Sequence, residues 1–534
     1  MATGAALFVD CLKACGIDTV FALPGEETNA LMDALARVDI DVVLCRHEQA
    51  AAFMASVHGR VTGRPAACLS TLGPGATNLL TGVADAQLDA VPLLAITGQG
   101  ARKRLPRGQH SHQVIDLARL FEPVTKRSET IMAASDIPGA VAEAMRVAMD
   151  PCPGAVHLSL PEDVADEDTD ADPVAVLPPA RPLPSPRAVS AAVTELSAHE
   201  RIMFLSGAGV TRTGTAPALA ALVASTGLPV ATSFMGKGCV SHDASSHLGA
   251  FGLPVDQLVD KAIADADVIV TVGLDPVEYP LEKLSGGTRP VVALAETSLP
   301  QNLGAPLAAE VVGDLRASLE ALTHALKGRR FEMWPSAQAA QRAYVEHREQ
   351  DVNAEPPTAP ALVAALNAVV APEDTVLSGV GTHKLALARD FVAHRPGQIV
   401  IANGLAGMGL ALPGAIAAAR LQSSGRVIAV CGDGDVMMNV QEMETAHRLD
   451  LPMTVIVWVD GGYGLIEDKQ EHDTGTRPNL SFGTVDWAAL AQSFGWSHTA
   501  CDTAAALQDA VQARPGDARQ RLITVPVRYT GAFA

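Results

Sequence analysis

Two aspartates in the last third of the chain, Asp433 and Asp460, stand where carboxylates can bind a metal ion. Asp433 lies in a Gly-Asp-Gly box directly after the apolar run RVIAVC, and Asp460 ends the next apolar run, PMTVIVWV. The 27 positions between them match one strand–helix–strand unit, so both carboxylates are expected at the same sheet edge. Two hard oxygen ligands beside a glycine-rich loop suit Mg²⁺ bound to a diphosphate. The alternative is an ordinary turn, because Asp-Gly is common in loops.

The residues after the box support a helix and a third metal ligand. Asn439 can cap the helix, with Glu442 three residues on as its capping-box partner. Gly434 lets the backbone approach phosphate oxygens, and Gly462 can offer its carbonyl to the metal.

The first third of the chain carries a second set of candidates. Glu48 begins a helix just past the strand-like run DVVLC, and the alternative is a first-turn acid that favours the helix dipole. The stretch TLGPGATN from Thr71 to Asn78 reads as strand, Gly-Pro-Gly and helix, and Pro24-Gly25 ends the first strand in a similar way. Each of these is a weak loop motif when taken alone.

Composition excludes several classes of protein. The 534 residues include 59 Asp and Glu against 39 Lys and Arg, a formal net charge of −20, so no basic field is available for nucleic acid. The eight cysteines form no C-x-x-C pair and several lie in apolar runs, which predicts reduced thiols and a cytoplasmic location. No signal peptide is visible. The charge-free segment 396–419 contains glycines and prolines, so we expect a loop and a buried helix there and no membrane span.

Strand-like and helical segments alternate in three blocks, which predicts an α/β fold with three doubly wound parallel-sheet domains. The expected domains are 1–165, 187–330 and 355–534. A linker rich in Pro, Asp and Ala, about 166–186, should run over the surface between the first two.

Together the candidate residues resemble the thiamine-diphosphate-dependent enzymes of the acetolactate synthase (acetohydroxyacid synthase) and pyruvate oxidase group. A Gly-Asp-Gly box followed 27 residues after its Asp by Asn or Asp is specific to thiamine-diphosphate enzymes. The remaining phrases narrow the match towards acetolactate synthases: RHEQAAAFMA, STLGPGATNLLTGVADA, VPLLAITGQ, ATSFMGKG, NGLAGMGLALPGAIAA and CGDG–MMN–QEMETA. The resemblance covers nearly the whole chain, in order.

The resemblance implies an enzyme and its site residues. Glu48 would hydrogen-bond the ring nitrogen of the aminopyrimidine, whose imino form then removes the thiazolium proton. Met408 matches the bulky apolar residue that folds the cofactor into its V shape, and Gln113 lies near the reactive end, so Glu48, Met408 and Gln113 form the catalytic set. Asp433, Asp460 and the Gly462 carbonyl would hold Mg²⁺. The implied cofactor-binding residues are Pro24, Gly25, Glu48, Thr71, Gly73, Asn78, Gly381, Thr382, His383, Gly404, Met408, Gly432, Asp433, Gly434, Asp435 and Tyr463.

In this group the first domain (pyrimidine-binding) of one chain and the third (diphosphate-binding) of its partner share the cofactor, so the resemblance implies a homodimer or homotetramer. The middle domain of the biosynthetic branch binds FAD. Gly207-Ala208-Gly209 is compatible with a nucleotide, but GLDPVEYP resembles the FAD-independent catabolic enzymes, which favours a chain without FAD.

The implied reaction is a carboligation. Pyruvate or a related 2-oxo acid loses CO₂, and the enamine adds to a second 2-oxo acid to give 2-acetolactate. Three residues depart from the family pattern: Asp435, where Gly, Ser or Ala is usual; Asp460, where many relatives have Asn; and Asp468, where an aromatic is usual. The alternatives are a specialised carboligase or 2-oxo-acid decarboxylase with another donor or acceptor, or a cofactor-binding paralogue without catalysis.

Overall fold

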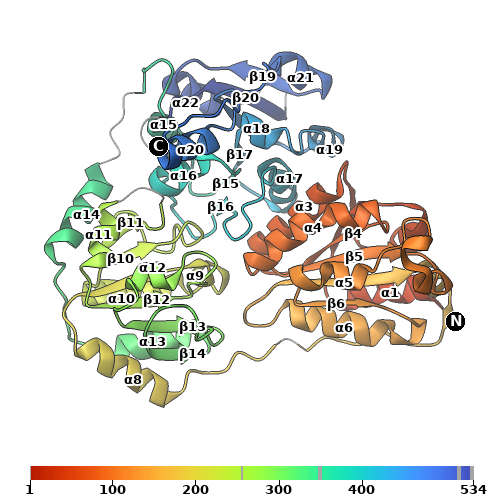
Figure 1. Cartoon of the computed structure of the whole chain (residues 1–534), viewed down its shortest axis with the longest axis horizontal. Helices are drawn as coiled ribbons and strands as arrows, with labels where there is room; N and C mark the ends of the chain where they lie inside the picture. The colour runs from red at the N-terminus through yellow and green to blue at the C-terminus, as the bar shows by residue number, and fades with distance from the viewer. Residues whose placement is uncertain (1, 178, 254–256, 347–351, 514–518, 530–534) are drawn as a thin grey trace. The chain divides into compact units, whose positions relative to one another are not determined.

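The computed structural model of the chain describes residues 2–177, 179–253, 257–346, 352–513 and 519–529. Within these residues, strands and helices alternate to form three sheets of six strands, and the strands of each sheet pair parallel to their neighbours (Figure 1). The predicted α/β class with three doubly wound parallel sheets is confirmed. Each predicted block holds one of the sheets.

The first sheet has the strand order β3-β2-β4-β5-β7-β6. Its strands are β2 (Thr19–Leu23), β3 (Asp41–Leu44), β4 (Ala66–Ser70), β5 (Leu93–Gln99), β6 (Arg127–Thr130) and β7 (Ala155–Pro161). Its helices are α1 (Gly4–Ala14), α2 (Asn29–Leu35), α3 (Glu48–Thr62), α4 (Pro74–Leu88), α5 (Leu117–Phe121), α6 (Ile137–Ala148) and α7 (Glu162–Ala165). A short antiparallel pair joins β1 (Ala2–Thr3) to β8 (Asp168–Thr169).

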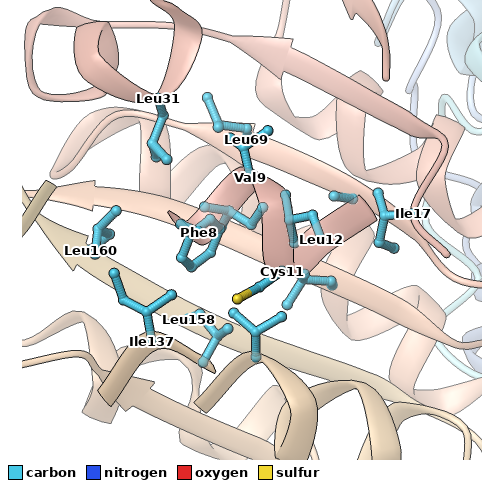
Figure 2. Packing of buried hydrophobic residues seen from close by; sticks show 14 of the residues in the cluster. Phe8, Val9, Cys11, Leu12, Ile17, Leu31, Leu69, Ile137, Leu158 and Leu160 are labelled. Carbon is cyan, nitrogen blue, oxygen red and sulfur yellow. The ribbon is translucent and has the colours of Figure 1, made fainter. Parts of the chain in front are cut away.

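Large apolar side chains fill the space between this sheet and its helices. Figure 2 shows Phe8 and Leu12 of α1 among Ile137 of α6 and Leu158 and Leu160 of β7, all of them buried. Burying a side chain of this size stabilises a fold by roughly 1.5–3 kcal/mol. The core therefore fixes the strands whose ends carry the candidate residues.

Helix α3 packs closely on α4. His47 caps α3 by accepting a hydrogen bond from the N–H of Gln49 (3.1 Å), and the helix ends at Gly63 in the left-handed conformation (φ 68°). A Cβ at Gly82 of α4 would overlap Ala52 of α3, so small residues allow this close approach.

The first sheet belongs to a compact unit that also takes in two segments of the third block, residues 404–422 and 438–451. They carry α17 (Ala411–Leu421) and α19 (Glu442–Arg448). Helix α17 lies beside α3 (Figure 1). The third block thus contributes helices to the unit that holds Glu48, which its composition did not suggest.

The second compact unit contains the other two sheets. The second sheet has the order β11-β10-β9-β12-β13-β14 and the third the order β16-β15-β17-β18-β20-β19. The strands are β9 (Ile202–Ser206), β10 (Val230–Thr232), β11 (His247–Ala250), β12 (Val268–Val272), β13 (Val291–Ala295), β14 (Leu307–Val312), β15 (Thr375–Ser378), β16 (Ile399–Ile401), β17 (Val427–Gly432), β18 (Met453–Val459), β19 (Ser497–Ala500) and β20 (Gln520–Pro526).

Helices connect these strands. They are α8 (Pro186–Ser197), α9 (Ala208–Arg212), α10 (Ala216–Thr226), α11 (Leu258–Ala264), α12 (Leu281–Ser285), α13 (Leu315–Ala325), α14 (Pro335–Glu346), α15 (Ala359–Val369), α16 (Thr382–Asp390), α18 (Asp433–Val436), α20 (Gly464–Thr474), α21 (Trp487–Ser493) and α22 (Ala504–Gln512). Among the described residues, no helix combines the length and the apolar character that a membrane span requires. All eight cysteines are free thiols.

The predicted capping box in the third block is wrong. Helix α19 begins at Glu442, and its N-cap residue Gln441 makes no side-chain cap hydrogen bond. Asn439 donates instead to the carbonyl of Gly409 (3.0 Å), and Glu442 accepts from the N–H of Arg46 (3.0 Å). These partners are distant in sequence, so tertiary contacts replace the local cap.

Candidate active site

Glu48 is the first residue of α3, directly after the turn that follows β3. Its side chain is buried, and its Oε2 accepts a hydrogen bond from Nδ2 of Asn78 in α4 (3.0 Å). A Cβ at Gly75 would lie 3.3 Å from the other oxygen, Oε1, so the glycine leaves that side of the carboxylate open. Two residues picked from separate motifs, Glu48 and Asn78, are therefore in direct contact.

The turn after β2 meets the turn after β4. A Cβ at Gly25 would come within 2.6 Å of the Thr71 hydroxyl, and that hydroxyl donates to Oε2 of Glu27 (2.7 Å). Thr71 also lies next to Gly75, and Gly75 in turn lies next to Glu48, so Gly25 and Thr71 belong to the surroundings of Glu48. Glu27 was not among the predicted residues; the signal for it is the pair of carboxylates directly after Pro24-Gly25.

Gln113 lies against the Gly-Pro-Gly turn. A Cβ at Gly73 would be 2.9 Å from the Gln113 carbonyl oxygen. Both residues have positive φ, 52° for Gly73 and 59° for Gln113. A left-handed conformation at a residue with a side chain costs roughly 1–3 kcal/mol and is common at binding sites. Gln113 therefore joins the group around Glu48.

The loop that carries Met408 is held by partners other than Glu48. The N–H of Gly404 donates to Oδ1 of Asp89 (2.6 Å), and Asp89 also pairs with the buried Arg60 (2.7 Å). Met408 itself is half-buried. Ala406, two residues before Met408, has φ 54°, so the loop is bent sharply. At its far end, the carbonyl of Gly409 accepts from Asn439, so the loop is anchored at both ends.

In the second unit, three neighbouring strands bring the remaining candidates to one edge. Strands β15, β17 and β18 are adjacent, and Gly432 at the end of β17 pairs with Trp458 of β18. Asp433 directly follows Gly432, and Asp460 lies two residues after Trp458, which confirms the predicted common edge. The carboxylate of Asp433 accepts from the N–H of Gly434 and of Gly461, both at 2.8 Å.

Asp460 faces Asp433 closely enough for the two carboxyl groups to share a proton. Burial, and then the charge of Asp433, raise the pKa of Asp460 above its usual range. Such a pair favours a proton or a cation between its oxygens. Among the described residues, no cluster of three or more His, Cys, Asp or Glu side chains offers a metal site. Two carboxylates alone suit Mg²⁺, because this ion takes few protein ligands and keeps positions for phosphate oxygens and water.

The turn after β15 opens helix α16. Gly381 has φ 156°, and Thr382 and His383, which begin the helix, are buried. Burial and the neighbouring Lys384 lower the pKa of His383 to about 3, so its ring is neutral at pH 7 and keeps one N–H donor. A Cβ at Gly432 would lie 3.2 Å from Nδ1 of His383. The predicted diphosphate-binding turns therefore lie side by side.

Asp435 turns its carboxylate into the protein. Oδ1 accepts from the N–H of Val380 (3.0 Å), and a Cβ at Gly379 would overlap Oδ2. The side chain is 2% exposed. A predicted contact between Asp435 and a cofactor stays a prediction; its hydrogen bond goes to the loop after β15.

The segment after Asp460 combines aromatic and charged side chains. Tyr463 packs edge-to-face on Phe482 with ring centroids 5.1 Å apart, and both rings lie beside Gly434. On α20, Asp468 pairs with Arg477, which also contacts Glu467 and Glu471. The unusual aspartate at 468 is thus part of an ion-pair cluster.

In the middle sheet, an internal carboxylate occupies the start of α9. Glu278 is buried, and both its oxygens accept from the N–H of Ala208 (3.0 Å). It also accepts from Ser233 Oγ (2.5 Å) and the N–H of Asp275 (2.9 Å). Arg212 of the same helix pairs with Glu296 after β13 (2.6 Å). The glycine turn that is compatible with a nucleotide therefore already holds the carboxyl group of Glu278.

Comparison with known families gives the same order of domains. Residues 2–120 match the N-terminal TPP binding domain of thiamine pyrophosphate enzymes, 189–322 the central domain and 379–525 the C-terminal TPP binding domain. Thiamine pyrophosphate (TPP) is another name for thiamine diphosphate.

Similar proteins share most of their length with this chain. An acetolactate synthase of Bacillus subtilis is 32% identical over 534 residues, 99% of this chain and 93% of that protein. A catabolic acetolactate synthase of Raoultella terrigena is 30% identical over 99% of this chain and 95% of its own. The large subunit of acetolactate synthase isozyme 2 of Escherichia coli is 30% identical over 92% of this chain and 89% of its own. The chain belongs to the acetolactate synthase family of thiamine pyrophosphate enzymes.

Proposed function

We propose that the chain is a thiamine-diphosphate-dependent carboligase that converts two molecules of pyruvate and a proton into 2-acetolactate and CO₂. The observation that carries the proposal is the placement of two sets of residues that would hold the cofactor: buried Glu48 on Asn78 in one unit, and the facing carboxylates of Asp433 and Asp460 in the other. Kinship with the acetolactate synthases supports the reaction. When bound, thiamine diphosphate supplies a carbon nucleophile and an electron sink for loss of CO₂ from a 2-oxo acid.

Glu48 would bind the ring nitrogen of the pyrimidine and hold the proton at that atom. Its burial and its single amide partner, Asn78, support this role, because a carboxylate in a dry site forms a strong hydrogen bond. The turns with Gly25, Thr71 and Gly73 would line the pyrimidine side, with Pro24 in the first of them. Gln113, beside Gly73, would face the reacting end, and Met408, from the loop that begins at Gly404, would support the bent cofactor.

Asp433, Asp460 and the carbonyl of Gly462 would hold Mg²⁺ on the diphosphate. Gly381, Thr382 and His383 would bind phosphate oxygens through the backbone N–H groups at the start of α16, because the imidazole of His383 is already hydrogen-bonded to the backbone of Gly379. Gly432 and Gly434 leave room for the phosphate, while Asp435 holds the neighbouring loop and Tyr463 packs beside Gly434.

The chain would work without FAD. The argument is the carboxyl group of Glu278, which already occupies the N–H of Ala208 that a nucleotide phosphate would need. The nearest carboxylate at a strand end, that of Glu296, is already paired with Arg212. A titration of the purified protein with FAD measures whether FAD binds and so tests this proposal.

The active form would be a homodimer or a dimer of dimers, with Glu48 of one chain and Asp433 of its partner at each site. Side chains near the metal site that are exposed in a single chain support an interface there: Tyr463, Ile466, Phe482 and Met437. The domain boundaries 1–165, 187–330 and 355–534 and a cytoplasmic location belong to the same proposal.

An NMR time course of the purified protein with thiamine diphosphate, Mg²⁺ and pyruvate tests the reaction. We expect acetolactate, and acetoin after acid treatment. Acetaldehyde alone would make the chain a decarboxylase. Unchanged pyruvate with bound cofactor would require another donor acid or a chain without catalysis, and other 2-oxo acids in the same assay separate these two.

A further inference from the structure

Helix α19 is bonded to the segment that leads into α3. The N–H of Arg46 donates to Oε1 of Glu442 (3.0 Å), and the N–H of His47 also donates to this carboxylate. These are the two residues immediately before Glu48. Backbone N–H groups at a helix start have no partner within the helix, so an acceptor from elsewhere must bind them.

Glu442 is built into this position. Its side chain is fully buried, and its second oxygen accepts from the hydroxyl of Thr445 one turn along α19 (2.6 Å). Burial raises the pKa of Glu442, and the hydrogen bonds from Thr445, Arg46 and His47 act in the opposite direction. A carboxylate with several directed donors holds its geometry firmly.

Two further contacts flank Glu442. Arg448 of α19 donates to the carbonyl of Leu44 at the end of β3 (2.6 Å), and Asn439 donates to the side chain of Gln49 (3.3 Å). The turn from β3 to α3 is therefore bonded to α19 through Leu44 and the residues before Glu48, and Gln49 just after Glu48 is bonded to Asn439, which precedes α19.

We propose that Glu442 is a positioning residue that fixes the first turn of α3 and thereby the carboxylate of Glu48. The inference rests on the proposed role of Glu48. Glu442 binds the backbone of Arg46 and His47 and has no part in the reaction itself. Its loss frees the turn from which Glu48 projects, and a misplaced general acid–base group loses rate without losing substrate affinity.

The test compares Glu442→Ala and Glu442→Gln with Glu122→Ala as the control. Glu122 is an exposed carboxylate of the same unit and takes part in none of these contacts. In protein free of cofactor, amide hydrogen exchange should be about tenfold faster at residues 46–48 in Glu442→Ala and unchanged elsewhere in the unit. With cofactor and pyruvate, kcat should fall about tenfold at unchanged KM, and Glu442→Gln should recover part of both.

The outcomes separate the two proposals. Unchanged exchange at residues 46–48, or unchanged kcat, overturns the positioning role while the carboligase stands. Faster exchange throughout the unit together with a lowered Tm also overturns it, because Glu442 is then only a core group. If Glu442→Ala does not fold, the glutamine variant decides by the same two measurements. If the wild-type chain converts no 2-oxo acid, the proposed function fails, and the exchange data alone still test the contact.

Discussion

The carboxylate of Asp435 accepts a hydrogen bond from the N–H of Val380 at 3.0 Å and so ties the turn after β17 to the turn after β15. A carboxylate directly after the Gly-Asp-Gly box is unfavourable beside a diphosphate if it points at the phosphate. Here it points into the neighbouring loop, and Gly379 leaves the space that it needs. The departure from the family pattern is thus accommodated within the protein.

Gly379→Ala should weaken cofactor binding, because the new Cβ would overlap the Asp435 carboxylate and push the two turns apart. We expect roughly a tenfold loss of thiamine diphosphate affinity by calorimetry in the presence of Mg²⁺. In the double variant Gly379→Ala, Asp435→Ala the overlap is removed, so the combined loss should be smaller than the sum of the single losses. Strictly additive losses would mean that the two residues do not interact.

Glu48→Gln should keep thiamine diphosphate bound and lower kcat by about 10²–10⁴-fold, the usual contribution of general acid–base catalysis. The amide still fits the buried position beside Asn78 but cannot hold the proton in the same way. Steady-state rates and calorimetry measure the two effects. Glu122→Gln, at an exposed carboxylate of the same unit, is the control. Turnover equal to that of the control would remove Glu48 from the mechanism.

Asp433→Ala should weaken Mg²⁺-dependent binding of thiamine diphosphate by about 100-fold or more, since a direct metal ligand is lost. Two backbone N–H groups, of Gly434 and Gly461, also lose their acceptor. A Mg²⁺ titration followed by cofactor fluorescence quenching or calorimetry measures the change. Asp473→Ala, on the exposed face of α20, should bind like the wild type. Equal Mg²⁺ dependence in both variants contradicts the metal site.

Mixed dimers test where the two halves of a site come from. Chains with Glu48→Gln and chains with Asp433→Ala are each expected to be inactive. If Glu48 and Asp433 of one site belong to different chains, a co-expressed mixed dimer has one site with both residues intact. Random pairing then restores roughly a quarter of wild-type activity. No recovery, in a preparation shown by mass spectrometry to contain mixed dimers, would place both residues of a site in one chain.

Glu278 predicts a pH-dependent stability. Burial raises its pKa from 4.5 to about 7, so the folded chain binds this proton more tightly than the unfolded chain does. Its contribution is complete below about pH 4.5 and decreases as the pH rises to about 7, by an amount on the order of 3 kcal/mol. The glutamine in Glu278→Gln does not titrate, so this variant lacks the pH-dependent contribution to the free energy of unfolding. Urea unfolding at several pH values should therefore show a steeper loss of stability for the wild type than for the variant.

The control for this experiment is Glu282→Gln, an exposed acid at the start of α12. Parallel pH profiles of the Glu278 variant and the wild type would contradict the buried, raised-pKa carboxylate.

Strands with continuous apolar runs could be predicted, whereas most edge strands could not. The runs RVIAVC and PMTVIVWV coincide with β17 and β18 to within one residue at each end. The edge strands β6, β11, β14 and β19 were not predicted; β6 and β19, for example, read RSET and SHTA and are only partly buried. Edge strands pair on one side only, so their sequences carry a weaker apolar signal.

Strand β7 shows a different limit of sequence reading. It is fully buried, yet a histidine interrupts its apolar run. His157 is bonded to Thr97 (2.9 Å) and Ser128 (2.8 Å) and stacks on Phe121. These partners come from other elements, so the polar ring of His157 can be buried only when the rest of the fold supplies its hydrogen bonds.

For the candidate site, strand-end positions were predictable and tertiary partners were not. Glu48, Thr71 and Asp433 were found because residues after parallel strands meet at one edge. The sequence predicts a local cap for Glu442, because sequence alone cannot reveal that its carboxylate accepts from the N–H of Arg46, nearly 400 residues away.

The first and third sheets have one strand order. If the strands of each sheet are numbered along the chain, the orders β3-β2-β4-β5-β7-β6 and β16-β15-β17-β18-β20-β19 place corresponding strands side by side in the same way. The strands of the middle sheet have a different order. The turns after β2 and β4 correspond to those after β15 and β17, and the segment with Glu48 corresponds to the one with Met408. The two edges are thus pseudo-equivalent scaffolds. Under the proposed function, the two edges would hold opposite ends of one ligand, and the turns and helices that follow corresponding strands would distinguish these ends.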